Sequence, residues 1–359
     1  MSTLCNSTVS AKEGWETQFR SGGNLPQLRQ NIITGEWVVM APERAKRPNE
    51  YVTPDTIKKQ SKKDCPFCVG KATYKTQIKD AETENIYVAP NKFPAFVKEE
   101  KISSRSYYPE DGFYRAKPAV GGHEIIIVKD HNLGLNKMPE NILAEMLEAT
   151  QKRYQYYHFD GLTEYIMGIY NHGAESGASI EHPHAQLFAS SIVPNHIIRE
   201  KHGAEKYFEI NGVCVFCDLV EHEKQEKIRI LYENEYFVGF TFYASRFPFE
   251  IWVLPKIHQS NFEDINKREI DALANALRLC LNMLDATLND PPLNYFIHSL
   301  PTTSDNADYF HWHLEIAPRL TGFGGYEMGA GTIIDIATPE SCADYLRQGL
   351  KNQEKFHKF

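Results

Sequence analysis

The sequence lacks the usual marks of a secreted, membrane or nucleic-acid-coating protein. Its seven cysteines are an odd number in 359 residues, which fits a disulfide framework poorly. The longest wholly aliphatic run covers four residues, 125–128, whereas a membrane helix needs roughly 18. The net charge of −8 argues against nucleic acid or an anionic membrane as a partner. The polar segment 1–23 has no apolar signal core, so we expect a cytoplasmic protein with reduced thiols.

Histidine, by contrast, is abundant, with 14 residues, and its placement follows an internal repeat. Two CxxC pairs, 65–68 and 214–217, each open the same order of features. A strand-like run, a single histidine, a helix-like stretch, a second strand-like run and a His-x-His pair follow each of them. The single histidine precedes the pair by 51 residues in the first copy and by 53 in the second. The expected helices cover 139–158 and 262–288, and the expected strands cover 123–128, 164–170, 182–186, 249–254 and 294–297.

This repeat predicts an α+β fold built from duplicated units, each with an antiparallel sheet and one long helix. The glycines and polar residues around 201–212 indicate the boundary between the units. We therefore expect four parts: a polar N-terminal extension over 1–24, an N-terminal half over 25–200, a C-terminal half over 205–347 and a charged tail over 348–359.

The cysteine pairs and the repeated histidines form two candidate metal sites. Thiolate and imidazole are the ligands that tetrahedral zinc takes, and four protein ligands make a closed, structural site. Thiol pairs without metal remain the alternative. A redox CxxC is disfavoured because no helix evidently starts at either pair, and a zinc ribbon because its pairs would lie roughly 15–20 residues apart. The first set is Cys65, Cys68, His131 and His182, and the second is Cys214, Cys217, His258 and His311.

The densest chemistry lies in the segment 171–186. Alternate residues of a strand share one face, so His182, His184 and Gln186 would point to the same side. A neutral imidazole such as that of His184 can attack phosphorus, and Gln186 can donate to a phosphate oxygen without adding charge. The turn 177–179 can offer the backbone N–H of Gly177 and a hydroxyl to phosphate. The second copy has Glu315 in place of Gln186, and a carboxylate repels phosphate, so we expect one catalytic site per chain.

With these motifs, the sequence from about residue 28 to 347 resembles the galactose-1-phosphate uridylyltransferase family of the histidine-triad superfamily. The segments that carry the resemblance are Thr-Gly-Glu-Trp at 34–37, Arg-Ala-Lys-Arg-Pro at 44–48, Cys-Pro-Phe-Cys at 65–68, Asn-Lys-Phe-Pro at 91–94, His-Pro-His-Ala-Gln at 182–186 and Gly-Tyr-Glu at 325–327.

The resemblance implies two histidine-triad-like halves, with antiparallel sheets forming a half-barrel under long helices, and a homodimer. It implies a double displacement in which His184 takes a nucleoside monophosphate from a nucleotide sugar and passes it to a sugar phosphate or inorganic phosphate. The remaining implied roles fall into three sets: Asn91 and Asn171 for the nucleotide; Ser179 and Gln186 for the phosphates; and Arg44, Arg47, Tyr326 and Glu327 for the sugar or the acceptor phosphate, with the arginines often acting across the dimer.

The sequence departs from typical uridylyltransferases in the glycine-rich segment 321–331, which resembles the ADP-glucose phosphorylase branch of the family. We expect a UDP-glucose:hexose-1-phosphate uridylyltransferase of galactose metabolism, with ADP-glucose phosphorylase as the alternative. A hydrolase and a non-catalytic zinc-binding module are less favoured. His298, His311 and His313 match iron ligands of some relatives, yet both thiols of the second site are present. We therefore expect two zinc ions per chain, with iron as the alternative at the second site.

Overall fold

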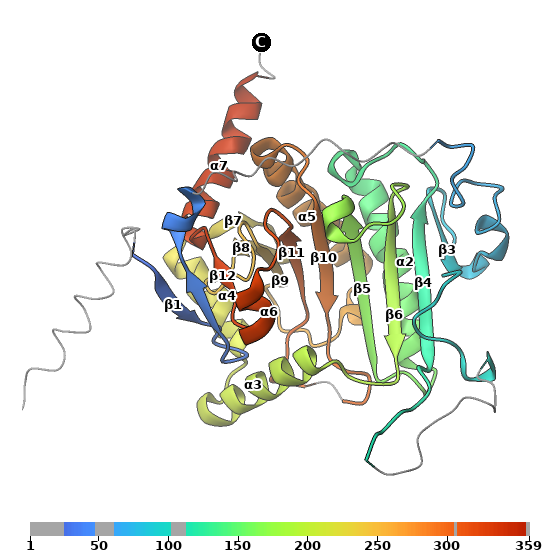
Figure 1. Ribbon diagram of the computed structural model, residues 1–359, viewed down its shortest axis with the longest axis horizontal. Helices are drawn as coiled ribbons and strands as arrows, with labels where there is room; N and C mark the ends of the chain where they lie inside the picture. Colours follow the sequence, from blue (N-terminus) through green and yellow to red (C-terminus); the bar gives the residue numbers. More distant parts are fainter. Residues whose placement is uncertain (1–24, 47–60, 102–112, 305–306, 357–359) are drawn as a thin grey trace, which may run out of the picture.

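The computed structural model describes residues 25–46, 61–101, 113–304 and 307–356. A nine-stranded sheet, antiparallel at every pairing, runs through its centre (Figure 1). The strand order is β3-β4-β6-β5-β10-β11-β9-β8-β7. Its strands are β3 (Ile86–Pro90), β4 (Gly121–Val128), β5 (Tyr165–His172), β6 (His184–Ser190), β7 (Ile230–Glu233), β8 (Phe237–Thr241), β9 (Ile251–Pro255), β10 (Leu293–His298) and β11 (His313–Pro318).

The strand order confirms the predicted duplication. The order β3-β4-β6-β5 of the first half returns reversed as β10-β11-β9-β8 in the second. The two halves meet where β5 pairs with β10, with Asn171 opposite Asn294. Their registers agree as well, because Ile125 of β4 lies opposite Gln186 and Trp252 of β9 lies opposite Glu315. The sequence and the hydrogen-bond ladder therefore repeat together.

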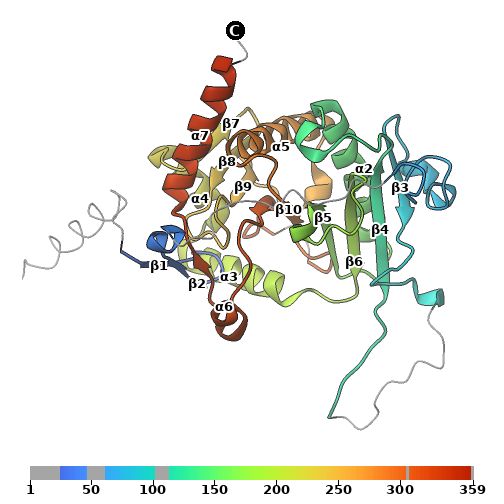
Figure 2. The same cartoon turned by 45° about the horizontal axis from the view of Figure 1, so that its top comes forward.

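Two long helices, α2 (Glu140–His158) and α5 (Lys267–Leu288), cover one face of the sheet and pack on each other (Figures 1 and 2). Asn266 caps α5 by accepting from the backbone of Glu269, whose side chain accepts from the backbone N–H of Asn266 in return. The apolar faces of both helices and the inward residues of the strands form the main core. Glu124 of β4 also points to this face, where Arg153 of α2 forms a buried ion pair with it. The opposite face of the sheet carries the candidate active site described below.

The connection between the halves is helical. The segment 201–212, which we expected to mark a boundary by its glycines and polar residues, lies mostly inside α3 (Asn195–Asn211). Gly203 is needed for packing, since a Cβ there would lie 1.7 Å from the carbonyl oxygen of Ile33. Gly212 ends the helix in the left-handed conformation. The helix α4 (Val215–Glu226) follows at once.

The expected strands agree with the observed ones to within two residues at most ends, and His182 is the instructive difference. The predicted strand 182–186 begins only at His184. Pro183 has no N–H to give to the ladder, and its carbonyl oxygen accepts from Val128 instead. His184 and Gln186 still share the face opposite α2, while His182 precedes the strand.

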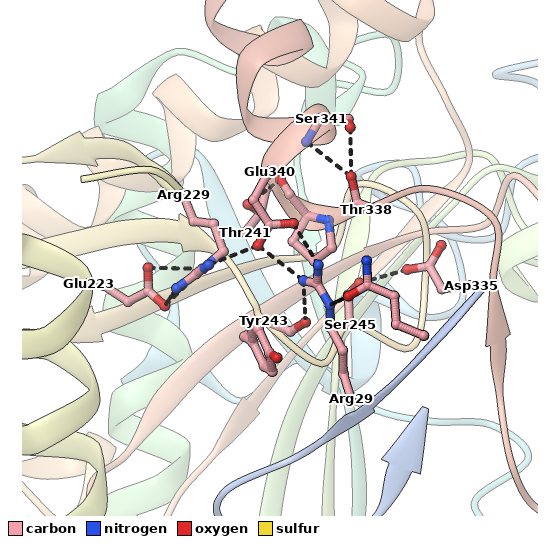
Figure 3. Close-up of polar contacts among 12 residues, drawn as sticks. Arg29, Glu223, Arg229, Thr241, Tyr243, Ser245, Asp335, Thr338, Glu340 and Ser341 are labelled. Carbon is pink, nitrogen blue, oxygen red and sulfur yellow. Dashed lines mark hydrogen bonds and ion pairs between the residues drawn. The ribbon is translucent and has the colours of Figure 1, made fainter. Parts of the chain in front are cut away.

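A three-stranded sheet of β1 (Gln27–Gln30), β2 (Trp37–Met40) and β12 (Ile334–Asp335) joins the beginning of the described chain to its end. Figure 3 shows the polar contacts behind this sheet. Arg29 donates twice to Glu340 at 3.0 Å. Arg229 donates to Glu340 at 2.8 Å and also to Glu223 of α4. Glu340 lies in the first turn of α7 (Pro339–Phe356), so one carboxylate links β1, α7 and the start of β7.

The remaining elements are short. The helix α6 (Gly325–Ala330) lies between β11 and β12. Within the described segments, no helix is long and apolar enough to cross a membrane. The single-turn 3-10 helices are η1 (Pro42–Lys46), η2 (Tyr74–Thr76), η3 (Lys79–Ala81), η4 (Glu99–Lys101), η5 (Leu135–Lys137), η6 (Ala174–Ser176) and η7 (Phe262–Asp264).

Candidate active site

The first candidate metal site is assembled by the fold. Cys65, Cys68, His131 and His182 bring their ligand atoms within 4.8 Å of one another. Nδ1 of His182 lies 3.4 Å from Sγ of Cys65 and 3.1 Å from Nδ1 of His131, which is itself 3.4 Å from Sγ of Cys68. Ligands on tetrahedral zinc lie about 3.3–3.8 Å apart, given the usual zinc–sulfur and zinc–nitrogen bonds. The four side chains therefore fit zinc.

The surroundings of His182 keep its imidazole neutral, as a metal ligand must be. Its Nε2 lies 2.6 Å from the carbonyl oxygen of Val128, so Nε2 carries the hydrogen and Nδ1 keeps its lone pair. Burial lowers the pKa of His182 to about 4. The neutral form that a metal requires is thus the one the protein holds.

The second candidate metal site repeats the first. Cys214, Cys217, His258 and His311 also converge within 4.8 Å. Nδ1 of His258 and Nδ1 of His311 lie 3.4 and 3.7 Å from Sγ of Cys217. Contacts with Cys217, His258 and His311, in that order, lower the pKa of the Cys214 thiol. This set also offers the donors that zinc takes.

One argument made from the sequence is wrong at this second site. We expected no helix to start at either CxxC pair, but α4 begins at Val215 with Cys214 as its N-cap. A thiol at a helix N-terminus is activated by the helix dipole, so the helix alone would permit redox chemistry. The case for a metal rests on the two histidines instead, because their Nδ1 atoms close the set around both thiols.

His184 is held as a neutral, oriented imidazole. Its Nδ1 lies 2.7 Å from the carbonyl oxygen of His182, so Nδ1–H donates there and Nε2 keeps its lone pair. Only 6% of the residue is exposed, and burial lowers the pKa of His184. The ring of Phe67, from the first CxxC loop, meets the imidazole edge to face at 5.0 Å. These are the features of a nucleophile set to act at neutral pH.

Gln186 lies two residues further along β6 on the same face, and a residue that sequence reasoning missed holds it. His123 of β4 places its Nε2 3.0 Å from Oε1 of Gln186 and 3.1 Å from Nδ2 of Asn91. Its ring stacks on Phe188 at 4.0 Å between centroids. The structure thus brings Asn91 and Gln186, two of the predicted binding residues, to the same ring nitrogen of His123.

The predicted phosphate loop follows β5 directly. Gly173 and Gly177 flank η6 with φ angles of +83° and +88°, which other residues rarely adopt. Gly177 and Ser179 are exposed. Asn171, at the end of β5, accepts from Nδ2 of Asn294 at 2.8 Å, so β10 of the second half orients it. Within the loop, the backbone N–H groups of Ser176 and Ala178 donate to the carbonyl of Gly173, and that of Gly177 donates to the carbonyl of Ala174 at 2.9 Å. The N–H of Gly177 that we expected to offer to phosphate is therefore engaged within the loop.

The second half carries a charged cluster at the place that corresponds to His184 and Gln186. Glu315 accepts from Arg246 at 2.5 Å and lies 3.4 Å from His313 and 3.6 Å from His298. Glu200 of α3 approaches the same two histidines at 3.1 and 3.0 Å. Against the effect of burial, Arg246 and the two histidines lower the pKa of Glu315 to about 2. His298 and His313 therefore have carboxylate partners, and only His311 of the three presumed iron ligands joins the thiols.

The remaining predicted residues lie in other parts of the molecule. Arg44 is exposed on η1, and Arg47 lies outside the described residues. Tyr326 and Glu327 lie on α6, where Glu327 accepts from the backbone N–H of Gly324. In both views α6 stands away from β6 (Figures 1 and 2). Within the described residues, one chain therefore brings Asn91, His184 and Gln186 to one face of the sheet and leaves Tyr326 and Glu327 on a separate element.

The fold and the site together define a duplicated α+β protein with two Cys₂His₂ groups and one buried, neutral histidine on β6. Comparison with known proteins agrees. Residues 16–194 and 200–356 match the N- and C-terminal domains of galactose-1-phosphate uridyl transferase, so the chain belongs to the galactose-1-phosphate uridylyltransferase family.

Its relatives include both branches of that family. The Arabidopsis thaliana ADP-glucose phosphorylase is 32% identical over 332 residues, which cover 90% of this chain and 93% of that protein. The Thermotoga maritima galactose-1-phosphate uridylyltransferase is 29% identical over 333 residues, covering 90% and 98%. The crystal structure of the Arabidopsis enzyme with bound ADP-glucose superposes with a TM-score of 0.75 at 31% identity, covering 90% of this chain and 99% of that one.

Proposed function

We propose that this protein is a nucleotidyltransferase that moves a nucleoside monophosphate from a nucleotide sugar to a phosphate acceptor through His184. The observation that carries the proposal is the state of His184, which is buried, neutral and hydrogen-bonded through Nδ1 to the carbonyl of His182. Such an imidazole presents the lone pair of Nε2 on the face that also holds Gln186.

The chemistry balances as two displacements at one phosphorus atom. In the first, Nε2 of His184 bonds to the α-phosphorus of the donor while the bond from that phosphorus to the bridging oxygen breaks, and the hexose 1-phosphate leaves. In the second, an acceptor phosphate oxygen bonds to the α-phosphorus and the nitrogen–phosphorus bond breaks. Gln186 donates to a phosphate oxygen, and the hydroxyl of the exposed Ser179, in the loop after Gly177, donates in the same way.

UDP-glucose and a hexose 1-phosphate are the preferred substrates. The family model supports this choice, and so do the relatives named galactose-1-phosphate uridylyltransferase, from Thermotoga maritima to Rattus norvegicus. ADP-glucose with inorganic phosphate as the acceptor is the second candidate. The 32% identity to the Arabidopsis phosphorylase and the glycine-rich segment 321–331 favour it.

Two zinc ions per chain complete the proposal, with iron as the alternative at the second site. Both Cys₂His₂ sets supply the donors and spacing of closed tetrahedral sites, so the metal would supply structural stability rather than chemistry. The first set is tied to the site directly, because its ligand His182 accepts the hydrogen bond from His184 and its loop carries Phe67.

We also propose a cytoplasmic homodimer in which the partner chain supplies sugar-side residues to each site. Arg44, on η1, and Tyr326, on α6, are both exposed. A second copy would bring these side chains to the face of β6 that one chain leaves without sugar contacts. The proposed substrates are small anions, and neither nucleic acid nor a membrane is a partner.

A donor-by-acceptor assay tests the function. The protein is incubated with UDP-glucose or ADP-glucose, each with galactose 1-phosphate or inorganic phosphate. We expect the UDP-glucose and galactose 1-phosphate pair to give the fastest turnover. A dominant ADP-glucose and phosphate reaction would move the assignment to the second candidate. No acid-labile nucleotidyl label on the protein with either donor would overturn the covalent mechanism.

A further inference from the structure

His123 is a buried polar side chain on the site face that the proposed reaction leaves unused. It is 9% exposed and lies between residues assigned to the nucleotide and to the phosphates. Nδ1 lies 3.2 Å from the backbone nitrogen of Ala95. A backbone N–H can only donate, so Nδ1 must accept, and the hydrogen of the neutral ring must sit on Nε2.

That tautomer determines how Gln186 is oriented. Nε2 of His123 lies 3.0 Å from Oε1 of Gln186, so the ring donates and the amide oxygen accepts. Nδ2 of Asn91, at 3.1 Å, is an amide nitrogen and cannot compete as an acceptor. With its oxygen engaged, Gln186 must turn its NH₂ group away from His123. An amide without this hydrogen bond could turn either its oxygen or its NH₂ group toward a phosphate, and only the NH₂ group would stabilise the phosphate.

Packing and charge keep His123 in this state. Its ring stacks on Phe188 with an interplanar angle of 28°, and burial lowers the pKa of His123. Protonation would place a hydrogen on Nδ1, facing the N–H of Ala95. The ring therefore stays a fixed donor to Gln186 at neutral pH.

The second half supplies an internal comparison. The repeat aligns His123 with Glu250 and Gln186 with Glu315, eight residues before and four residues after corresponding metal-ligand histidines. Glu250 accepts from the backbone N–H of Arg246 and from Nε1 of Trp252. These positions are thus occupied by two carboxyl groups that accept hydrogen bonds from Arg246 and Trp252, whereas the first half keeps a neutral donor chain that ends in the NH₂ group of Gln186.

We infer that His123 is a positioning residue of the transfer reaction, which orients the Gln186 amide so that its NH₂ group meets the phosphate of the donor. This inference rests on the proposed function. It assigns His123 no contact with substrate, and its effect on the rate must therefore pass through Gln186.

A double-mutant cycle tests it by the rate of single-turnover labelling of the full-length protein. Radiolabelled UDP-glucose is the probe, or ADP-glucose where that donor labels the wild type. His123→Phe keeps the stacking ring and loses the donor, so we expect labelling to slow by about 10- to 100-fold, since one lost phosphate donor costs about 100- to 1,000-fold. His123→Gln, which can donate an N–H to Oε1, should recover part of the rate. In the Gln186→Ala background, His123→Phe should slow labelling less than about twofold further.

The controls separate positioning from folding. His222→Phe, the same replacement on the exposed face of α4, should label at the wild-type rate. Metal content and thermal midpoint should be the same in His123→Phe as in the wild type; where that variant does not fold, His123→Ala and His123→Gln complete the cycle. Wild-type labelling rates in His123→Phe, or losses that multiply with those of Gln186→Ala, would overturn the inference alone. An unlabelled wild type would overturn the proposed function, and this inference with it.

Discussion

The carbonyl oxygen of His182 lies 2.7 Å from Nδ1 of His184. The ring of His182 thus belongs to the first candidate metal site, and its backbone carbonyl fixes the tautomer of His184, the proposed nucleophile. Pro183 between them ends the ladder, so the carbonyl of His182 is free to accept this bond. The first Cys₂His₂ set and the proposed nucleophile are therefore held together by one hydrogen bond.

His184→Gly should abolish the covalent label and turnover while the protein remains folded. The variant removes the only imidazole placed on the site face of β6, and it leaves both Cys₂His₂ sets intact. Labelling with radioactive donor measures the covalent intermediate, circular dichroism the fold, and elemental analysis the metal content. Persistent turnover in this variant would place the nucleophile elsewhere.

Elemental analysis of the purified protein should find two metal ions per chain. His131→Ala and His258→Ala should each lower the content to one, because each removes one of four ligands from a different set. His131→Ala should slow labelling more than His258→Ala does, since only the first set includes His182. One ion or none in the wild type would refute one or both sites, and iron in the second would decide its identity.

Mixing two inactive variants should restore activity if each site draws on both chains of a dimer. His184→Gly lacks the nucleophile, and Arg44→Ala lacks a sugar-side cation. A heterodimer would contain one site with both residues, so we expect up to about a quarter to a half of the wild-type rate after subunit exchange. Either variant mixed with itself is the control. No recovery despite demonstrated exchange would place Arg44 in the site of its own chain.

Arg153→Leu should lower the free energy of unfolding by about 3–5 kcal/mol, because it leaves the buried carboxylate of Glu124 without its cation. Adding Glu124→Gln should recover part of the loss, since the remaining amide is neutral. Lys152→Ala, on the exposed side of the same helix turn, should change stability by less than about 0.5 kcal/mol. Urea unfolding measures the stability of all three variants. Equal destabilisation by Arg153→Leu and Lys152→Ala would refute the role of the ion pair between Glu124 and Arg153.

Asp335→Asn should stabilise the protein more at pH 8 than at pH 5. Burial raises the pKa of Asp335 to about 7, with Glu250 adding to the rise and Ser245, Ala337 and Arg29 opposing it. Between about pH 4 and 7 the unfolded chain therefore releases a proton that the folded chain keeps, and stability falls as pH rises. We expect the difference between variant and wild type to grow by about 3 kcal/mol between pH 5 and pH 8. A difference independent of pH would contradict it.

The sequence alone was enough to predict the duplicated fold and the residues of both Cys₂His₂ groups. A CxxC pair and two histidines occur in the same order in both halves. Because the two halves also have the same strand order, equal spacing along the sequence places these residues at equivalent positions of the sheet. The helix at Cys214 was missed because Val215 and Phe216 do not resemble a typical helix start, and packing on the second core decides it.

His123 could not be assigned for a different reason. A single histidine at the head of an apolar strand predicts nothing by itself. Its role depends on β4 lying antiparallel to β6 with His123 opposite Phe188, a register that no local pattern specifies. The orientation of Asn171 by Asn294 likewise depends on the pairing of β5 with β10.

That pairing of β5 with β10 also bears on how such a chain could arise. A single unit with strands β3 to β6 would expose β5 as a bare edge, which invites another copy to add to it. Two equal copies meeting there would form a symmetric pair with two identical sites. Fusion into one chain lets the copies differ, and here one half has a neutral amide at Gln186 where the other has Glu315. The charged cluster around Glu315 then serves stability, because its ion pairs support the same nine-stranded sheet on which the first half carries His184.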